Sequence, residues 1–304
     1  MPNLVHLPHR SLISIKGRDT FKYLQALTTN NLSRPQSQYT SFLNAQGRVL
    51  YDAFIYRTAE SECLVEVDAS LADGVVGHLG RYKLRSKFEM RRLDPSELGI
   101  YSLFDQSAAA ASVPAAGSAE SVLQDTRAPN FGTRIVSSSC PSAALDLEPS
   151  SVLEYVRHRY RHGVPEGPDE LVPGRALPME SNIDYMNGLD FHKGCYLGQE
   201  LTVRTYHTGV IRKRIVPVTV PPSAENRDAG PWSLETEGSQ VTFPTESGVK
   251  ARPAGRVLGG VGTLGLALLR LDKVGQRGQV TINGSQVDVV ASRPGHWPSD
   301  PGSM

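Results

Sequence analysis

The segment from Lys193 to Glu200 combines residue types that do chemistry with residue types that give access to it. It contains a lone cysteine, Cys195, with a lysine two positions earlier and glycines nearby on both sides. Glycine removes bulk beside a sulfur and allows backbone angles closed to other residues. A nearby lysine favours the thiolate, which is the form that attacks carbonyls or binds metals. The pattern fits a nucleophile, a metal ligand or a close contact with a partner, and its candidate residues are Lys193, Gly194, Cys195, Tyr196, Gly198, Gln199 and Glu200.

The other cysteines and the nearby histidine give weaker signals. His192 stands three positions before Cys195, which suggests a Cys–His nucleophile. Catalytic pairs of this kind are adjacent in space rather than in sequence, and no local hydrolase signature surrounds this cysteine. Cys63 and Cys140 have ordinary neighbours, so we expect both to be buried and inert.

Positive charge concentrates just after the cysteine segment. Arg204, Arg212, Lys213 and Arg214 form either a solvated face or an anion site for a polycarboxylate ligand or an acidic partner. Glu180 follows a stretch rich in proline and glycine. A glutamate in such a loop is either exposed or positioned to accept two hydrogen bonds from a donor-rich heterocycle.

Composition narrows the classes of protein that need to be considered. The chain has 304 residues, 39% hydrophobic and 21% charged, with a net charge of +1. These values predict a globular protein of two or three domains and give no field that steers it to nucleic acid. No apolar run is long enough to span a bilayer, so we expect no membrane insertion. Three scattered cysteines indicate a reducing compartment, and the first residues show neither a signal peptide nor an Arg-rich leader.

Hydrophobic spacing predicts mixed helices and strands. Helices are expected from Asp19 or Thr20, over 71–79, and from a capping box at Ser151 to Gly163. Loops rich in small and polar residues are expected near 106–121 and 137–149. Strands are expected over 12–15, 40–43, 49–56, 88–90 and 100–104, and again from Ile215 onward.

The segment Gly260–Gly265 matches a dinucleotide-binding pattern of glycines. That motif needs a following helix and a parallel sheet, and the chain after it reads as strands and turns. We therefore expect a β-turn with close strand packing here.

Several of these segments together resemble a known family. Lys193–Glu200 is similar to the signature of the YgfZ-type iron–sulfur assembly factors, mitochondrial branch, which are folate-binding-fold relatives of the glycine-cleavage aminomethyltransferase (T-protein). The likeness covers nearly the whole chain apart from the two loops and the last dozen residues. Further matches lie in 17–25, 47–52, 125–129, 163–167, 208–214 and 265–270.

The resemblance implies an α+β fold: a three-domain cloverleaf of the T-protein type around a central channel, with a small β-barrel-like domain at the C-terminus. The first domain would be discontinuous, formed by 1–46 and 150–212. The second would span 47–149 and the third 213–304.

The same resemblance implies maturation of [4Fe–4S] clusters in the mitochondrial matrix together with A-type scaffold proteins. An iron–sulfur cluster normally takes four protein ligands, so one thiolate cannot hold it alone. We therefore expect Cys195 to ligate a [2Fe–2S] cluster shared with a scaffold, with Lys193 assisting its deprotonation.

A tetrahydrofolate-dependent aminomethyl or one-carbon transferase is the alternative function. The enzyme relatives carry paired acids where this chain has Tyr51 and Asp52, and the loss of one carboxylate argues against turnover. Glu180 matches the glutamate that contacts the pterin in those relatives. The residues expected to bind tetrahydrofolate are Glu180, Asp52 and Arg204.

Overall fold

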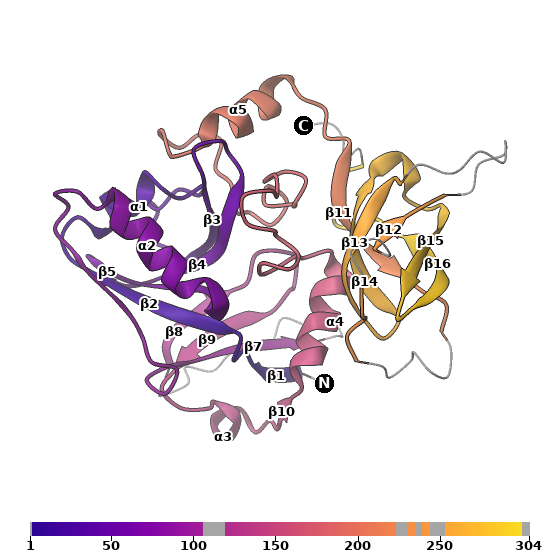
Figure 1. Ribbon diagram of the computed structural model, residues 1–304. Coiled ribbons are helices and arrows are strands. Elements are labelled where there is room, and N and C mark those ends of the chain that lie inside the picture. The colour runs from indigo at the N-terminus through magenta and orange to yellow at the C-terminus, as the bar shows by residue number, and fades with distance from the viewer. Residues whose placement is uncertain (1, 106–118, 223–229, 235–238, 244–252, 300–304) are drawn as a thin grey trace.

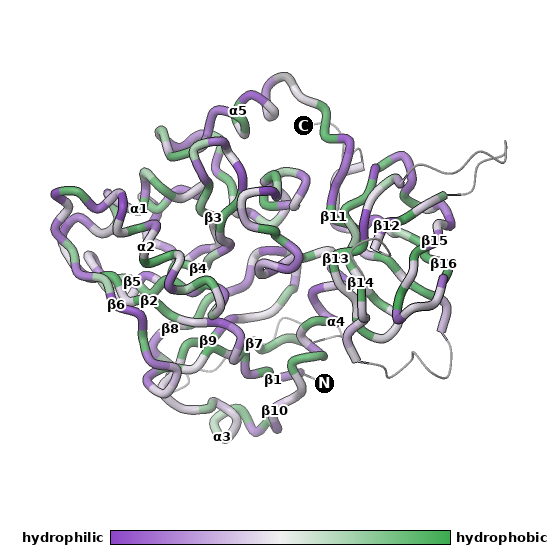
Figure 2. Tube along the Cα trace, viewed as in Figure 1, coloured by the Kyte–Doolittle hydropathy of each residue, from purple (hydrophilic) through white to green (hydrophobic). Residues whose placement is uncertain are grey.

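Three β-sheets organise the residues that the computed structural model describes, which are 2–105, 119–222, 230–234, 239–243 and 253–299 (Figure 1). Hydrophobic residues follow the strands of all three sheets, whereas the segment around α5 is largely hydrophilic (Figure 2). The α+β class expected from the sequence is confirmed.

The first sheet has the order β3-β4-β5-β2-β6 and is antiparallel throughout. Side chains alternate across its strands, so that Leu12 enters one core cluster while Ile13 and Ile15 enter another, under α2. Because both faces are covered, β2 and β4 are buried along most of their length. The elements are β2 (Arg10–Lys16), α1 (Thr20–Gln25), β3 (Gln38–Leu43), β4 (Val49–Ala59), β5 (Glu62–Asp68), η1 (Ala69–Leu71), α2 (Ala72–Tyr82) and β6 (Glu89–Arg92).

The second sheet has the order β10-β1-β7-β9-β8. Helix α4 begins at the cap Ser151, whose hydroxyl accepts a hydrogen bond from the backbone N–H of Leu153 at 3.2 Å, and ends at Gly163 in the left-handed region. The elements are β1 (Pro2–His6), β7 (Gly99–Asp105), β8 (Ala119–Gln124), β9 (Thr133–Ser137), α3 (Ser142–Leu145), β10 (Pro149–Ser150) and α4 (Val152–His162).

The third sheet has the order β12-β13-β14-β11-β16-β15, and a bridge between Thr242 and Gln279 brings its two edges together. It is therefore a nearly closed six-stranded barrel, which confirms the small C-terminal barrel. The elements are β11 (Lys213–Thr219), β12 (Gln240–Val241), β13 (Gly255–Val261), β14 (Leu264–Arg270), η2 (Leu271–Lys273), β15 (Arg277–Ile282) and β16 (Ser285–Ala291).

The glycine-rich segment 260–265 contains the hairpin turn between β13 and β14 and the strand ends beside it, as expected. A Cβ atom on Gly260 would lie 2.0 Å from the Trp232 ring, and one on Gly265 would lie 2.6 Å from it. These glycines therefore leave room for Trp232 and do not form a nucleotide-binding loop.

The expected helices and strands before residue 105 are confirmed, but the two expected loops are not entirely loops. Residues 106–118 lie outside the described residues, and strand β8 begins at Ala119. The loop expected over 137–149 contains the short helix α3.

The expected domain division stays a prediction. The hydrogen bonds between β3 and β4 cross the boundary expected at residue 46, so a unit that ends there would divide the first sheet. One buried cluster contains residues of all three sheets, including Leu12, Phe104 and Leu266. None of the helices in the described part of the chain has the length and apolar character needed to cross a bilayer.

Candidate functional site

The thiol of Cys195 is exposed, in a loop that leads directly into α5 (Gln199–Thr208). Gly194 beside it is exposed too. Accessibility was the condition that the sequence argument placed on this sulfur, and the structure meets it.

The two glycines of the segment have different roles. Gly198 caps the start of α5 at φ +80°, and a Cβ there would lie 2.2 Å from the carbonyl oxygen of Asn44. Asn44 lies in the turn between β3 and β4, as does Gly47. Gly47 has φ +77°, and a Cβ there would lie 2.8 Å from the carbonyl oxygen of Gly198. A Cβ on Gly194 would meet nothing within 4 Å. Close backbone contact therefore holds the start of α5 against this turn at Gly198, while Gly194 leaves open space.

Lys193 is directed into the protein. Its ammonium donates to the carbonyl oxygens of Gln25 at 2.8 Å, Thr28 at 2.6 Å and Asn30 at 2.8 Å. Burial lowers the pKa of Lys193 to about 7, and Asp190 opposes that shift. An ammonium has three N–H donors, and all three are used. The expected role of Lys193 in deprotonating Cys195 is therefore corrected: this side chain attaches the Cys195 loop to the chain that follows α1.

The next residues fix the same loop from inside. Tyr196 is buried, and its backbone N–H donates to Oε1 of Gln199 at 3.1 Å. The backbone N–H of Leu197 donates to the carbonyl oxygen of Ala26 at 2.9 Å. Glu200 is exposed in the first turn of α5, where a carboxylate stabilises a helix.

A cavity of about 380 Å³ lies beside α5. Glu180 lines it and is half-buried, and burial raises the pKa of its carboxyl group while Lys213 and Arg48 oppose that shift. Its walls are apolar with polar and basic groups among them: Arg48, Leu177, Pro178, Met179, Glu180, Leu201, Thr202, Thr205, Val210, Ile211 and Arg212. Size and lining are those of a site for a small, partly polar ligand.

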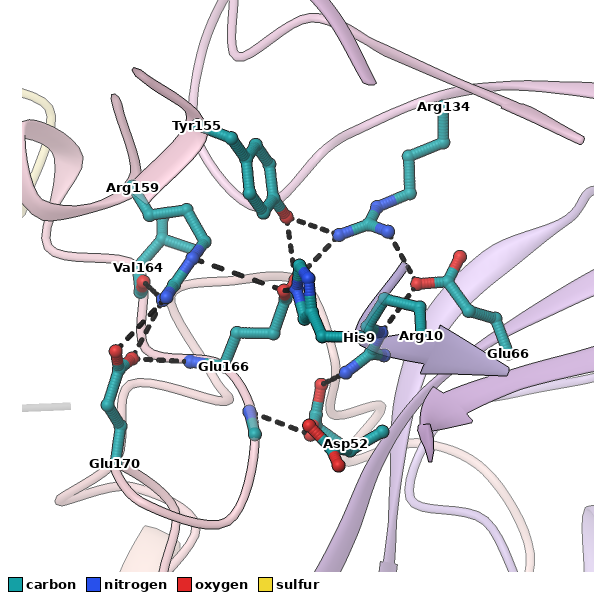
Figure 3. Close-up of polar contacts among 12 residues, drawn as sticks. His9, Arg10, Asp52, Glu66, Arg134, Tyr155, Arg159, Val164, Glu166 and Glu170 are labelled. Atoms are coloured by element: carbon teal, nitrogen blue, oxygen red, sulfur yellow. Dashed lines mark hydrogen bonds and ion pairs between the residues drawn. The ribbon is translucent and has the colours of Figure 1, made fainter. Parts of the chain in front are cut away.

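Asp52 is not among the residues that line this cavity. Its carboxylate accepts from Nη1 of Arg10 at 3.1 Å and from the backbone N–H of Gly167 at 3.1 Å (Figure 3). Tyr51 points to the other face of β4 and packs edge-on against His78 of α2, with ring centroids 5.9 Å apart. The acid expected to bind the cofactor is thus engaged in a buried ionic network.

That network joins the first two sheets, α4 and the segment after it. Glu166 accepts from Arg134 at 2.6 Å and from the Tyr155 hydroxyl at 2.7 Å (Figure 3). It also accepts from Arg127 at 2.7 Å. Burial opposes the ionisation of Glu166, but Arg134, Arg10 and Arg127 hold its pKa well below the usual range. The charged members are Arg10, Asp52, Glu66, Asp125, Arg127, Arg134, Arg159, Glu166 and Glu170.

Sequence reasoning did not find this network. Its members lie in separate segments, and only folding brings them within hydrogen-bond distance. One signal was available: Arg134 directly precedes the apolar pair Ile135 and Val136 of β9, and a charge on a buried strand needs a partner.

The basic residues after the cysteine do not form one site. Arg204 is exposed on α5 and does not line the cavity, whereas Arg212 does. Arg214 is fully buried, pairs with Asp184 at 2.8 Å and lies 3.7 Å from the Tyr185 ring centroid.

The remaining thiols behave differently from each other. Cys63 is buried, which raises its pKa to about 12, as expected for an inert thiol. Cys140 is exposed, so the expectation that it is buried was wrong. Among the described residues, no hydrogen bond joins His192 to Cys195, and no group of three His, Cys, Asp or Glu side chains is placed to hold a metal ion.

Two family profiles match this chain. One is described as the GCVT N-terminal domain and covers residues 4–100. The other is described as the CAF17 C-terminal beta-barrel domain and covers residues 212–299.

Curated relatives match most of the chain. A protein of Neurospora crassa named iron–sulfur cluster assembly factor IBA57 homolog, mitochondrial, is 41% identical over 88% of this chain and 70% of its own length. A protein of Chaetomium globosum with the same name is 40% identical over 88% of this chain and 71% of its own length.

A solved structure supports the fold. The glycine cleavage system aminomethyltransferase T of Bartonella henselae matches with a TM-score of 0.69, over 96% of this chain and 85% of that one. Its sequence is 16% identical, so this likeness concerns the T-protein-type architecture alone.

Proposed function

The chain belongs to the IBA57 family of mitochondrial iron–sulfur cluster assembly factors, and we propose from this premise that it matures [4Fe–4S] clusters in the mitochondrial matrix. An assembly factor acts with protein partners. We propose that the partner here is an A-type scaffold protein that carries the cluster.

The observation that carries this proposal is the exposed thiol of Cys195 on a loop fixed from inside. A cluster normally takes four protein ligands, and a single thiolate supplies one. Cys63 is buried and cannot reach a partner, and the other exposed thiol, Cys140, lies outside the loop that Lys193 and Gly198 hold in place. Cys195 is therefore one ligand of a [2Fe–2S] cluster shared between this protein and the scaffold, which supplies the other ligands.

The test is anaerobic mixing of the protein with a cluster-loaded A-type scaffold, followed by gel filtration with detection of cluster absorbance. We expect a coloured complex for the wild type. Cys195→Ser should lose the shared-cluster spectrum, whereas Cys140→Ser, the other exposed thiol, should keep it. A Cys195→Ser complex with an unchanged cluster spectrum would remove Cys195 as a ligand.

For the cavity beside α5 we propose tetrahydrofolate as the ligand. The half-buried carboxyl group of Glu180 can pair with the donors of a pterin ring, and the apolar walls can cover its faces. When bound, this cofactor carries one-carbon groups. We propose binding without turnover, because the carboxylate of Asp52 is engaged by Arg10 and Gly167 and does not line the cavity.

Calorimetry with tetrahydrofolate tests the cavity separately from the cluster. Binding heat should be lost in Glu180→Gln and kept in Arg204→Gln, because Arg204 lies outside the lining. No heat for the wild type at millimolar ligand would end the folate proposal and leave the role of Cys195 untouched.

A further inference from the structure

A second hollow lies next to the Cys195 loop, between the end of α1 and the chain that follows α2. We call it the α1–α2 groove; its volume is about 720 Å³. It is lined by Asp19, Lys22, Tyr23, Ala26, Leu27, Tyr82, Leu84, Arg85 and Ser86. Neither the proposed cluster chemistry nor the folate cavity uses these residues.

Leu84, which lines the groove, has an unusual backbone conformation and an unusually exposed apolar side chain. It follows the C-cap of α2 with φ +45°, in the left-handed region where glycine or asparagine is usual. Its side chain is 90% exposed, so burial within the protein does not offset that strain. Strained backbone clusters at ligand-binding and switch sites, and here it places an exposed leucine on a hollow whose lining also contains Tyr23 and Tyr82.

Basic residues surround this leucine. Arg81 in the last turn of α2 is followed at every second position by Lys83, Arg85 and Lys87, with no acidic residue between them. Lys22 adds a further positive charge from α1. The acidic member of the lining, Asp19, is engaged, because its Oδ2 accepts from the backbone N–H of Lys87 at 2.7 Å. The groove therefore complements an acidic partner.

The groove and the Cys195 loop share the end of α1. Ala26 lines the groove, and its carbonyl oxygen accepts the backbone N–H of Leu197 at 2.9 Å. Gln25, the last residue of α1, accepts from Lys193 at 2.8 Å. A partner seated in the groove thus lies next to the loop that presents the thiol.

We propose that the α1–α2 groove docks an acidic segment, with an apolar side chain at its centre, from the scaffold protein that brings the cluster to Cys195. This inference rests on the proposed function and adds the contact surface. The apolar side chain packs on Leu84 and the walls formed by Tyr23 and Tyr82, while acidic residues on either side pair with Lys22 and Arg85. An aliphatic anchor at the rim favours a protein over a nucleic acid, which would be held by phosphate contacts and ring stacking.

Two groove variants and a control test this surface by calorimetry with a cluster-loaded A-type scaffold. Leu84→Gly should raise the Kd for the scaffold about tenfold or more, because it removes a central apolar anchor. Arg85→Glu should raise the Kd for the scaffold about fivefold. It should also make that Kd depend less on salt concentration. Val122→Ser, at a half-exposed valine of β8, should bind as the wild type does.

Thermal unfolding separates loss of contact from loss of fold. Glycine accommodates φ +45° without strain, so Leu84→Gly should have a Tm equal to or above that of the wild type while it binds more weakly. A variant that both binds as the wild type and keeps its Tm would overturn the docking surface.

The outcomes distinguish this inference from the proposed function. Normal binding by both groove variants, with loss of the cluster spectrum in Cys195→Ser, overturns the groove alone. Weak binding by the groove variants, with an unchanged spectrum in Cys195→Ser, overturns the cluster ligand alone. No binding of the scaffold to the wild type overturns both the partner and the groove. Binding of a labelled RNA that Arg85→Glu abolishes and Leu84→Gly does not affect would overturn the groove as a site for a protein segment.

Discussion

Alanine at Gly198 should damage the Cys195 loop far more than alanine at Gly194. Both are glycines of one short segment, one residue before and three residues after Cys195. At Gly198 the backbone has φ +80°, and a Cβ would lie 2.2 Å from the carbonyl oxygen of Asn44. At Gly194 the surroundings are open within 4 Å. The two variants thus form a matched pair that differs in backbone constraint.

The magnitude follows from two contributions. A non-glycine residue in the left-handed region costs about 1–2 kcal/mol. The contact is with backbone, which cannot rotate away, so the start of α5 must move, and overpacking of this kind costs about 1–3 kcal/mol. We therefore expect Gly198→Ala to lower the free energy of unfolding by about 2–5 kcal/mol, and Gly194→Ala to change it by no more than about 0.5 kcal/mol.

Urea unfolding of both variants measures this difference, and the rate of thiol modification reports on the loop itself. A Cys140→Ser background leaves Cys195 as the exposed thiol in the described part of the chain. Gly198→Ala should alter the rate at which Cys195 is modified, because its loop is released from the β3–β4 turn. Equal stability and equal thiol reactivity in the two variants would refute the assignment of Gly198 as the point of attachment.

Three further predictions concern buried charge. Lys193→Met should lower the free energy of unfolding by about 2–3 kcal/mol in urea melts, because three carbonyl oxygens lose their donor. Glu166→Gln should lower it by about 3–5 kcal/mol, because Arg127 and Arg134 lose a buried counter-charge; a loss below about 1 kcal/mol would contradict the buried network. Burial, together with His162, lowers the pKa of His158 to about 4, so the unfolded chain binds the proton more readily between pH 6.5 and 4. Stability should therefore fall by up to about 3 kcal/mol as pH drops through that window, and urea melts of His158→Gln should show a shallower fall.

Local pattern was enough to predict many of the elements. The capping hydroxyl at Ser151 and the left-handed Gly163 bound α4 as expected, because both act within a few residues. The turn at Gly47 joins β3 and β4 as expected, because it too depends only on residues close in the sequence. The loop expected over 137–149 missed α3, a single turn too short for its periodicity to show in the sequence.

The site was predictable where it depended on chemistry and not where it depended on distant partners. Residue types singled out Cys195 and Glu180, and Glu180 does line a cavity, but the exposure of Cys195 could be read only from the fold. The role of Lys193 did not follow, because its acceptors lie more than 160 residues away in the chain. The role of Asp52 did not follow either, because its carboxylate is held by Arg10, whose position depends on the pairing of β2 with β5.

The structure assigns most of the polar and glycine residues of the cysteine segment to holding the loop in place. Lys193 uses its three donors on carbonyl oxygens, Gln199 accepts from the backbone of Tyr196, and Gly198 allows α5 to begin against the β3–β4 turn. These groups are the ones that a thiol enzyme would need beside its sulfur as base, orienting group or oxyanion donor. Because they are engaged elsewhere, the reactive character of the segment is concentrated on the exposed sulfur of Cys195. A fixed loop that exposes one thiol is suited to a cluster site that a partner completes. A shared cluster needs each of its ligands held in position before the partner binds.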